Sequence, residues 1–477
     1  MKILFQEPLV ERSITYGKFE AGAGNNTFPY GVACIASYLR ERGFSDVHYL
    51  EPSIEKMDAN KYARFLHKYS FDVIGIGSTT LQVGRSFRTF ELAKRVRPDI
   101  ITVLGGVHGT LMPRESLEEC AAVDYIILGE GEKPFYELLR CLRDGDKKGI
   151  GLIRGIAFRE KGKVVISPPD YDNMLAPEEL PFPAYDLFPM RKYIGQTTFS
   201  KVFPTYSLIA SRGCPFKCGF CNANDVLGRR VRYKEVDRVI DEVLFLKKRY
   251  GARGIMFLDS TFTLNGKWVE EFCHKMIERK VGLPWACNSR VDTVSERLLR
   301  LMKKAGCWEV VFGVESWNQK SLDLINKGTT VEQNEKALKA CMKAGLFTFA
   351  SYIICLPGEN ADDAMNTIRM AKKIGTHIAI FYLPIPFPKT PLYEICKKQG
   401  LLRKNAPWED YNSWDVSNPI YINPLIGKKK MQRLWRYAIL TYYLNPKVIL
   451  MNLREIIFLR QDIRKYIYAA KSLLGVV

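Results

Sequence analysis

Three cysteines lie close together near the middle of the chain. Cys214, Cys218 and Cys221 occur in the run Ser-Arg-Gly-Cys-Pro-Phe-Lys-Cys-Gly-Phe-Cys-Asn, separated by three residues and then by two. The glycines and the proline predict an irregular loop whose backbone can approach a bound group. A structural zinc site usually takes four protein ligands, but no fourth cysteine or histidine follows before Cys273. Three thiolates on a [4Fe–4S] cluster leave one iron open. The loop therefore predicts chemistry at that iron.

The elements that precede this loop alternate between short apolar strands and helices. This alternation predicts a parallel, doubly wound, Rossmann-like sheet, in which ligands bind at the carboxyl ends of the strands. The expected strands are 2–6, 47–50, 71–78, 100–104 and 125–128, and the expected helices are 30–42, 83–96 and 133–143. Turns at the strand ends supply the candidate binding residues Ser78, Thr79, Gly105, Gly106, His108, Gly129, Glu130 and Gly131.

A second alternating series begins near residue 204. Its six expected strands are 206–210, 254–258, 285–289, 309–312, 348–354 and 378–383. Polar or turn residues follow these strands, where the active sites of βα barrels are built. The candidates are Asp259, Ser260, Arg290, Glu315, Leu356 and Pro357.

Composition and turn signals divide the chain into four predicted segments. A proline-rich linker with a small hairpin separates the two alternating series, because proline favours an extended connection. The predicted limits are 1–145 for the first domain, 146–200 for the linker, 201–405 for the partial barrel and 406–477 for a basic, aromatic, helical C-terminal region.

The cysteine spacing, with Phe220 before the last cysteine, resembles the cluster loop of radical S-adenosylmethionine (SAM) enzymes. The resemblance implies a partial (β/α)6 barrel in which the open iron binds SAM. It also implies that an electron from the cluster cleaves SAM to methionine and a 5′-deoxyadenosyl radical. The runs Val311-Phe312-Gly313-Val314-Glu315-Ser316, Ile325-Asn326-Lys327-Gly328-Thr329 and Leu356-Pro357-Gly358-Glu359 strengthen the resemblance.

The same resemblance implies roles for the strand-end residues. Asp259 and Ser260 would meet the SAM amine, and Arg290 would pair with the carboxylate. Glu315 would meet the ribose or the methionyl end. Phe220, Leu356 and Pro357 would lie near adenine. Each residue has a purely structural alternative, such as a helix cap or a surface ion pair.

The first domain resembles the cobalamin-binding domain that precedes the radical SAM domain in one large subfamily. Pro29-Tyr30-Gly31 and Gly105-Gly106-Val107-His108 carry this resemblance, whereas the Asp-x-His-x-x-Gly motif of mutase-type domains is absent. The resemblance implies cobalamin at the turns named above, without a motif histidine on cobalt. The alternative is a degenerate Rossmann domain that only packs against its neighbour.

Composition places the chain among ordinary globular proteins, with 47% hydrophobic and 26% charged residues. The start of the chain becomes polar too early for a signal peptide, and no run of about 18 apolar residues predicts a membrane span. Twelve cysteines in such a chain indicate a reducing cytoplasm and no disulfide framework.

The net charge of +20 is concentrated toward the C-terminus. From Leu425 onward, eleven lysines and arginines stand against two acidic residues. They alternate with aromatic residues, including Trp435, Tyr437 and Tyr442. Three interpretations stay open: a helical cap with a solvated basic face, a surface that meets anionic lipid headgroups at the inner membrane face, and a nucleic-acid surface. Since no nucleic-acid-binding module is recognisable, we expect no nucleic-acid partner.

Together these features predict a cobalamin-dependent radical SAM enzyme that methylates an unactivated carbon. The expected cofactors are a [4Fe–4S] cluster, SAM and cobalamin. The expected partners are a small-molecule or lipid-like substrate and an electron donor such as flavodoxin or ferredoxin. The alternatives are a non-methylating radical SAM cyclase or rearrangement enzyme, and a non-catalytic iron–sulfur electron-transfer protein.

Overall fold

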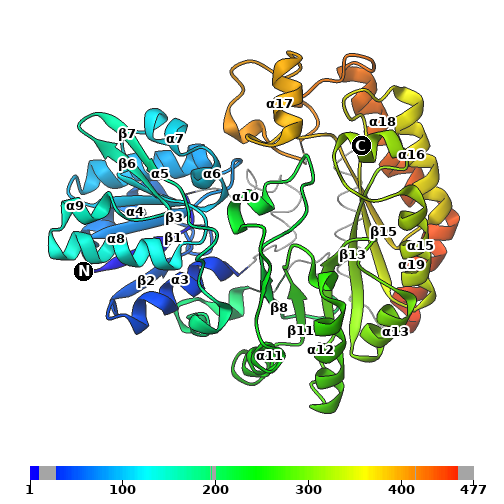
Figure 1. The fold of residues 1–477 in the computed structure, drawn as a ribbon, viewed down its shortest axis with the longest axis horizontal. Helices are drawn as coiled ribbons and strands as arrows, with labels where there is room; N and C mark the ends of the chain where they lie inside the picture. Colours follow the sequence, from blue (N-terminus) through cyan, green and yellow to red (C-terminus); the bar gives the residue numbers. More distant parts are fainter. Residues whose placement is uncertain (10–27, 194, 196–199, 414, 460–477) are drawn as a thin grey trace.

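The computed structural model describes residues 1–9, 28–193, 195, 200–413 and 415–459. Within these ranges the chain forms a seven-stranded mixed sheet and a six-stranded parallel sheet, each with helices packed around it (Figure 1).

The first sheet has the strand order β2-β1-β3-β4-β5-β6-β7. Its parallel part comprises β1 (Ile3–Gln6), β2 (Val47–Leu50), β3 (Val73–Gly77), β4 (Ile101–Gly105) and β5 (Tyr125–Ile127). Helices α3 (Tyr30–Glu41) and α8 (Glu132–Asp144) cover one face, and α4 (Ala59–Tyr69), α5 (Val83–Val96) and α7 (Pro113–Glu119) cover the other. The predicted doubly wound, Rossmann-like fold is confirmed.

The predicted hairpin of the linker belongs to this first sheet. Strands β6 (Ile156–Glu160) and β7 (Lys163–Ser167) pair with each other, and β6 pairs antiparallel with β5. The hairpin therefore protects the edge of the parallel sheet from further strand pairing.

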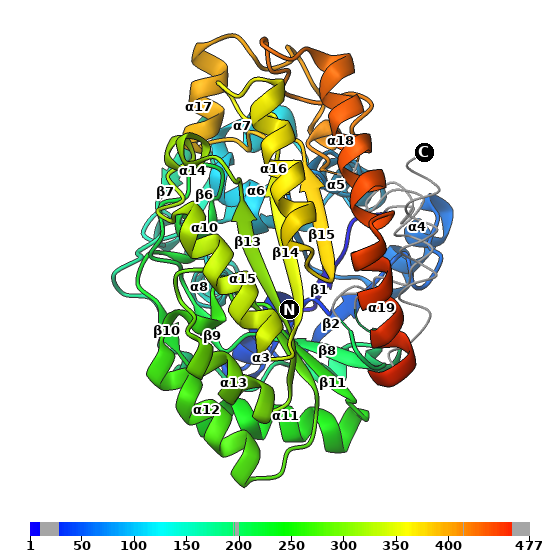
Figure 2. The same cartoon turned by 90° about the vertical axis from the view of Figure 1, so that its right-hand side faces the viewer.

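The second sheet has the order β15-β14-β13-β12-β11-β8, and every neighbouring pair is parallel. The strands are β8 (Thr205–Leu208), β11 (Gly254–Phe257), β12 (Trp285–Ser289), β13 (Cys307–Glu315), β14 (Phe347–Ile353) and β15 (Ile378–Tyr382). The helices α11 (Val236–Tyr250), α12 (Gly266–Glu278), α13 (Glu296–Lys304), α15 (Val331–Lys343) and α16 (Ala361–Ile374) connect them (Figure 2). The predicted six-stranded partial barrel is confirmed.

The three cysteines lie in a loop closed by a hairpin that the sequence did not indicate. Strand β9 (Ser211–Arg212) precedes the cysteines and pairs antiparallel with β10 (Arg232–Tyr233). Between them, after the last cysteine, lies the short helix α10 (Ala223–Leu227). Two-residue strands leave no periodic apolar pattern, so their pairing depends on the tertiary contacts of the loop.

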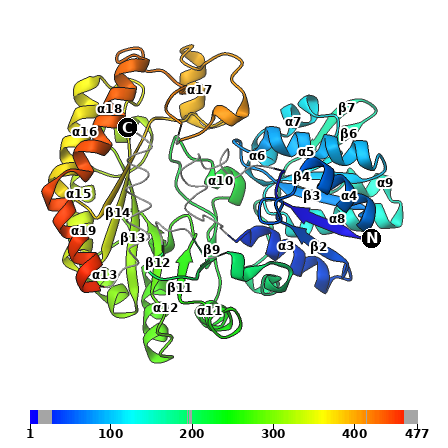
Figure 3. The ribbon, with the colours of Figure 1, turned by 180° about the vertical axis from the view of Figure 1, so that it is seen from behind.

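Helix α17 (Pro391–Lys398) follows β15, and the C-terminal region then contributes α18 (Lys428–Tyr443) and α19 (Pro446–Leu459). Helix α18 buries Met431, Leu434, Trp435, Ala438 and Tyr442 against the barrel (Figure 3). Its Trp435 donates a hydrogen bond to the carbonyl of Phe381 at 2.7 Å. These contacts support the helical-cap interpretation for α18.

The end of the basic region lies beyond this helical cap. Residues 460–477, with Arg460, Arg464, Lys465, Tyr466 and Tyr468, lie outside the described residues. Among the helices that the structure describes, none is both long enough and apolar enough to cross a membrane.

Candidate functional site

The cluster loop presents its three thiols differently from the remaining cysteines. Cys214 and Cys218 are partly exposed and Cys221 is exposed, whereas the other nine cysteines are buried. The backbone N–H of Cys214 donates to the carbonyl of Gly228 at 3.0 Å, which closes the loop at its base. The N–H of Cys221 donates to the carbonyl of Cys218 at 3.1 Å. The loop thus holds accessible thiols on an ordered backbone.

Two glycines let this loop pack closely. Gly213 has φ +104°, and a Cβ there would collide with the carbonyl oxygen of Arg230, two residues before β10. The N–H of Gly219 donates to the carbonyl of Ile325 at 2.6 Å, and its carbonyl accepts from the N–H of Leu392 at 2.8 Å. Gly219 thereby joins the loop to segments that follow β13 and β15.

Burial and mutual repulsion both act on the thiols of the loop. Burial raises the pKa of Cys214, and Cys218 raises it further, whereas Arg290 and Lys327 oppose the shift. Burial also raises the pKa of Cys221, and both Cys218 and Cys214 add to this. The three sulfurs therefore lie near one another.

The described residues nevertheless contain no group of three His, Cys, Asp or Glu side chains arranged to hold one metal ion. A [4Fe–4S] cluster binds three such thiolates, each through a different iron. The donor set fits such a cluster.

Arg290 follows β12 and reaches the cluster loop. Its side chain is only 6% exposed. The guanidinium lies 3.6 Å from the ring centre of Phe216, and Nη1 donates to Sγ of Cys218 at 3.5 Å. Nε and Nη2 each donate to a different oxygen of Asp292 at 2.9 Å. Arg290, which the sequence predicts to bind SAM, thus contacts the cluster loop and already has hydrogen-bond partners within the protein.

Glu315 ends β13 and forms a buried ion pair that the sequence did not indicate. Its carboxylate lies 2.8 Å from Nζ of Lys327, and the two side chains are 7% and 6% exposed. A Cβ at Gly313 would collide with the Glu315 carboxylate and lie 2.8 Å from the Lys327 ammonium. Nζ of Lys327 lies 5.7 Å from the ring centre of Phe220. Lys327 belongs to the Asn-Lys-Gly-Thr run, which was the available signal for it.

Asp259, after β11, supports the strand that enters the cluster loop. Its carboxylate accepts from the N–H and the hydroxyl of Ser211 at 2.5 and 2.6 Å and from the N–H of Ala210 at 3.1 Å. Burial raises the pKa of Asp259, and these donors oppose the rise. The neighbouring Ser260 is exposed. Of the two predicted amine contacts, Asp259 therefore already has structural partners and Ser260 is accessible.

Leu356 and Pro357 form a buried turn after β14. Leu356 packs with Ile325, Ile353 and the partly buried ring of Phe220. The side chain of Asn423, from the C-terminal region, donates to the carbonyl of Leu356 at 2.8 Å and to that of Glu359 at 2.9 Å. The structure therefore brings Phe220 and Leu356 together, as the predicted adenine contacts require, and Asn423 fixes the turn.

The predicted cobalamin turns meet at the carboxyl edge of the first sheet. The N–H of Ser78 donates to the carbonyl of Gly105, and the N–H of His108 donates to the carbonyl of Ser78, both at 3.0 Å. Gly106 has φ +82°, and a Cβ there would lie 2.6 Å from the nitrogen of Ser78. Ser78 is buried, whereas Thr79 is exposed. The turns are thus interlocked through their backbones.

His108 is a buried histidine with one unused ring nitrogen. It lies in α6 (Gly106–Leu111), with Nδ1 3.3 Å from the hydroxyl of Thr80. No described residue is a hydrogen-bond partner of its Nε2. The ring of Trp408, from the C-terminal region, lies against it with centres 4.7 Å apart. Burial lowers the pKa of His108 to about 4, so the imidazole is neutral at pH 7. A buried ring nitrogen without a partner calls for an explanation, and a group bound at these turns would supply the missing hydrogen bond.

Glu130, in the third predicted turn, is committed to ion pairs between the two domains. It pairs with Arg232 at 2.5 Å and with Arg212 at 3.1 Å, while Glu132 pairs with Arg212 at 2.7 Å. We call these four residues the interdomain ion-pair network; its side chains are 4 to 12% exposed. Burial lowers the pKa of Arg212, but Glu132 and Glu130 outweigh this and raise it.

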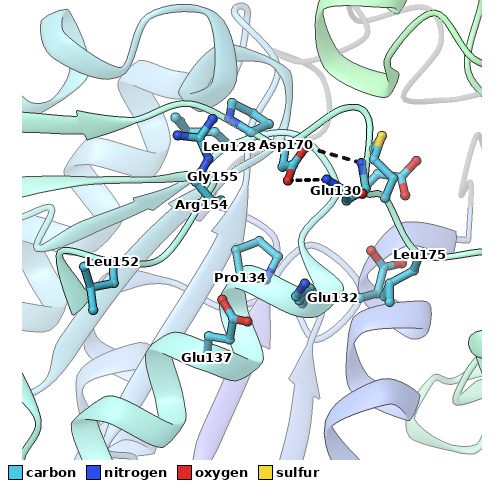
Figure 4. A pocket seen from close by; sticks show the side chains of 14 residues that line it. Leu128, Glu130, Glu132, Pro134, Glu137, Leu152, Arg154, Gly155, Asp170 and Leu175 are labelled. Carbon is cyan, nitrogen blue, oxygen red and sulfur yellow. Dashed lines mark hydrogen bonds between the residues drawn. The ribbon is translucent and has the colours of Figure 1, made fainter. Parts of the chain in front are cut away.

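A cavity of about 180 Å³ lies beside Glu130 and Glu132, between the sheet edge and linker residues 169–175 (Figure 4). Gly129 approaches this linker as well, because a Cβ there would lie 3.3 Å from the Pro169 ring. A Cβ at Gly131 would lie 2.7 Å from the Ile35 side chain. The cavity is smaller than the roughly 300–1,000 Å³ of drug-sized ligand sites. Gly129, Glu130 and Gly131 thus contact protein segments in this structure.

The two sets of turns face each other. Helix α10, which follows Cys221, contacts α6, which contains His108 (Figure 1). The carboxyl edge of the first sheet therefore lies beside the cluster loop.

Replacement of Gly213 by Ala tests the loop geometry. The new Cβ requires a strained positive φ and collides with backbone, so we expect the unfolding free energy to fall by more than about 2 kcal/mol and iron binding to decrease. Gly266→Ala, where a Cβ meets nothing within 4 Å, is the control and should stay within about 0.5 kcal/mol. Denaturant unfolding and iron content measure both. Equal behaviour of the two variants would contradict the assignment.

The low pKa of His108 predicts a pH-dependent stability. Because the folded protein resists protonating this imidazole, its contribution falls as pH decreases from about 6.5 toward 4. Between pH 7.5 and 5 the loss is about 2 kcal/mol. Denaturant unfolding should show that this part of the pH dependence is missing in His108→Gln and retained in the control His67→Gln, since His67 is exposed. An unchanged slope in His108→Gln would refute the buried neutral imidazole.

Comparisons with known proteins agree with this arrangement. The Radical SAM superfamily matches residues 208–371, and the B12 binding domain matches residues 21–139. The first range contains all three loop cysteines, and the second contains the turns around Ser78, Gly105 and Gly129.

Relatives extend the similarity over nearly the whole chain. An uncharacterised methyltransferase of Pyrococcus horikoshii is 34% identical over 95% of both chains. An anaerobic magnesium-protoporphyrin IX monomethyl ester cyclase of Rubrivivax gelatinosus is 31% identical over 83% of this chain and 70% of its own. The solved structure of the methyltransferase TsrM from Kitasatospora setae, with cobalamin and a [4Fe–4S] cluster bound, has a similar fold, with a TM-score of 0.71 at 18% identity over 93% of this chain and 89% of that one. The chain belongs to the radical SAM proteins that carry an N-terminal B12-binding domain.

Proposed function

We propose that the chain is a cobalamin-dependent radical SAM enzyme that methylates an unactivated carbon of a small-molecule substrate. The observation that carries this proposal is the contact between α10 of the cluster loop and α6 of the first domain. This contact supports the proposal because it brings the cluster loop beside the first-domain helix that contains His108. The methyltransferase of Pyrococcus horikoshii, similar over 95% of both chains, supports methyl transfer.

Each of the two sheets would hold a different cofactor. The first domain, residues 1–145, would hold cobalamin at Ser78, Thr79, Gly105, Gly106 and His108. Glu130 would act between Gly129 and Gly131 by fixing the third turn through its arginine partners. The barrel, residues 201–405, would hold the [4Fe–4S] cluster on Cys214, Cys218 and Cys221. The linker 146–200 would connect them, and 406–477 would cap the barrel.

The barrel residues would also orient SAM. Ser260 is exposed, so its hydroxyl could accept a hydrogen bond from the SAM amine. Phe220, Leu356 and Pro357 would line an apolar position for adenine. The Glu315–Lys327 pair offers a charged site beside Phe220. When bound, the cluster supplies the electron that splits SAM, and cobalamin supplies a carrier for the methyl group. The close packing of both sets of turns would exclude water from this region.

Products distinguish methyl transfer from its alternatives. We expect protein reconstituted anaerobically with iron, sulfide and cobalamin, and supplied with SAM and dithionite, to form 5′-deoxyadenosine and S-adenosylhomocysteine. Cys218→Ala should lose the cluster absorbance and both products, because only two thiolates remain. Cys141→Ala, a buried cysteine of the first domain, is the matched control and should keep them.

The remaining outcomes decide between the other candidates. Formation of 5′-deoxyadenosine without S-adenosylhomocysteine would favour a non-methylating reaction, as in the cyclase of Rubrivivax gelatinosus that is 31% identical. A bound cluster with neither product would favour an iron–sulfur electron-transfer protein. Absence of a cluster from the wild-type chain would refute the proposal altogether.

We also propose, as a finer point, that the C-terminal region meets anionic lipid headgroups or a lipid-like substrate. Exposed Tyr437, Leu444 and Leu450 lie in the same helical region as Lys447 and Arg454. Such surfaces bind anionic membranes through apolar burial and charge. Co-sedimentation with anionic vesicles, lost at 0.5 M salt because charge is screened, is the expected result. Equal binding to neutral vesicles, or no binding, would contradict it.

A further inference from the structure

We propose that Arg290 acts on the iron–sulfur cluster and not on the carboxylate of SAM. In this role it is a positioning residue: it donates a hydrogen bond to the sulfur of Cys218 and thereby raises the reduction potential of the cluster. The inference rests on the proposed function only in assuming that the three cysteines bind a [4Fe–4S] cluster.

The donors of Arg290 are almost fully used. An arginine has five N–H groups. Two are directed at the oxygens of Asp292, one at the carbonyl of Lys327 at 2.8 Å and one at Sγ of Cys218 at 3.5 Å. A bidentate pair with a SAM carboxylate needs two parallel N–H groups, and only one N–H is left. Arg290 would have to abandon Asp292 in order to bind the carboxylate in this way.

The guanidinium is also fixed in position. Asp292 lies two residues further along the chain and holds Nε and Nη2 in a fork, which sets the plane of the group. The ring of Phe216, between the first two cysteines, stacks on this plane at 3.6 Å. With 6% of the side chain exposed, water competes little for the remaining donor. Nη1 is therefore directed at Cys218 by contacts on three sides.

The chemical effect follows from the charge of a reduced cluster. One electron adds one negative charge, which spreads onto the thiolate sulfurs. Hydrogen bonds to these sulfurs stabilise the reduced form and raise the reduction potential. Because Asp292 neutralises the guanidinium overall, the directed hydrogen bond matters more than the net charge. Lys327 is likewise neutralised by Glu315 at 2.8 Å.

Potentiometric titration of the reconstituted cluster tests this role. Titanium(III) citrate supplies the electrons, and electron paramagnetic resonance counts reduced clusters in the wild type, Arg290→Gln, Arg290→Lys and Asp292→Asn. At a fixed potential we expect Arg290→Gln to lower the ratio of reduced to oxidised cluster about tenfold, equivalent to about 59 mV for one electron. Asp292→Asn loosens the fork but also removes the charge that neutralises the guanidinium, and because these two effects oppose each other it should lower the ratio less.

The control is Arg297→Gln, because Arg297 is an exposed arginine that also pairs with a carboxylate, that of Glu270. It should titrate like the wild type. Thermal unfolding and iron content are measured on every variant, so that loss of the fold is separated from a change of potential. A potential equal to that of the wild type in iron-loaded Arg290→Gln overturns the proposal.

Should Arg290→Gln fold but lose iron, Arg290→Lys and then Asp292→Asn decide by the same criterion. Folded protein without a cluster in all three variants would also overturn the tuning role, because Arg290 would then only maintain the loop. A wild-type chain that binds no cluster refutes the proposed function. If the wild-type chain cleaves SAM but the reduction potential of Arg290→Gln equals that of the wild type, only this inference is refuted.

Discussion

The interdomain ion-pair network is the constraint on which the arrangement of both sites depends. Arg212 directly precedes the cluster loop and Arg232 directly follows it, while Glu130 and Glu132 lie at the carboxyl edge of the first sheet. Buried charges are costly unless each is paired, and removal of one partner typically costs about 3–5 kcal/mol. Four charges that satisfy one another therefore fix the two domains in one relative position.

A second buried cluster also links the first domain to the barrel. The carboxylate of Glu242 accepts from the hydroxyls of Tyr30 and Tyr185 at 2.8 and 2.6 Å, and it pairs with Lys234 at 2.7 Å. Tyr30 begins α3 of the Rossmann-like domain, and Lys234 directly follows β10. The interface is thus specified by polar groups that tolerate little displacement, which suits two cofactor sites that must stay in register.

Several residues serve the site by holding others in place. Asp259 holds the strand that enters the cluster loop, and Asn423 holds the turn after β14. Gly313 leaves room for Glu315, whose φ of +65° directs its carboxylate toward Lys327. The strand ends therefore form a layered support, in which the groups nearest the cysteines are themselves oriented by buried partners.

The sequence by itself determined the repeating βα order, the two sheets and the three-thiol loop, because apolar periodicity and cysteine spacing are local. It also carried a signal for α4, which is missing from the expected helices, because Tyr62, Phe65, Leu66 and Tyr69 have helical apolar spacing there. It also could not reveal that Arg290 is occupied by Asp292 and Cys218, or that Lys327 pairs with Glu315. Nor could it place Trp408 on His108, since their contact spans 300 positions of the chain. Strand-end position predicts which residues gather, whereas side-chain partners depend on distances that only the folded chain sets.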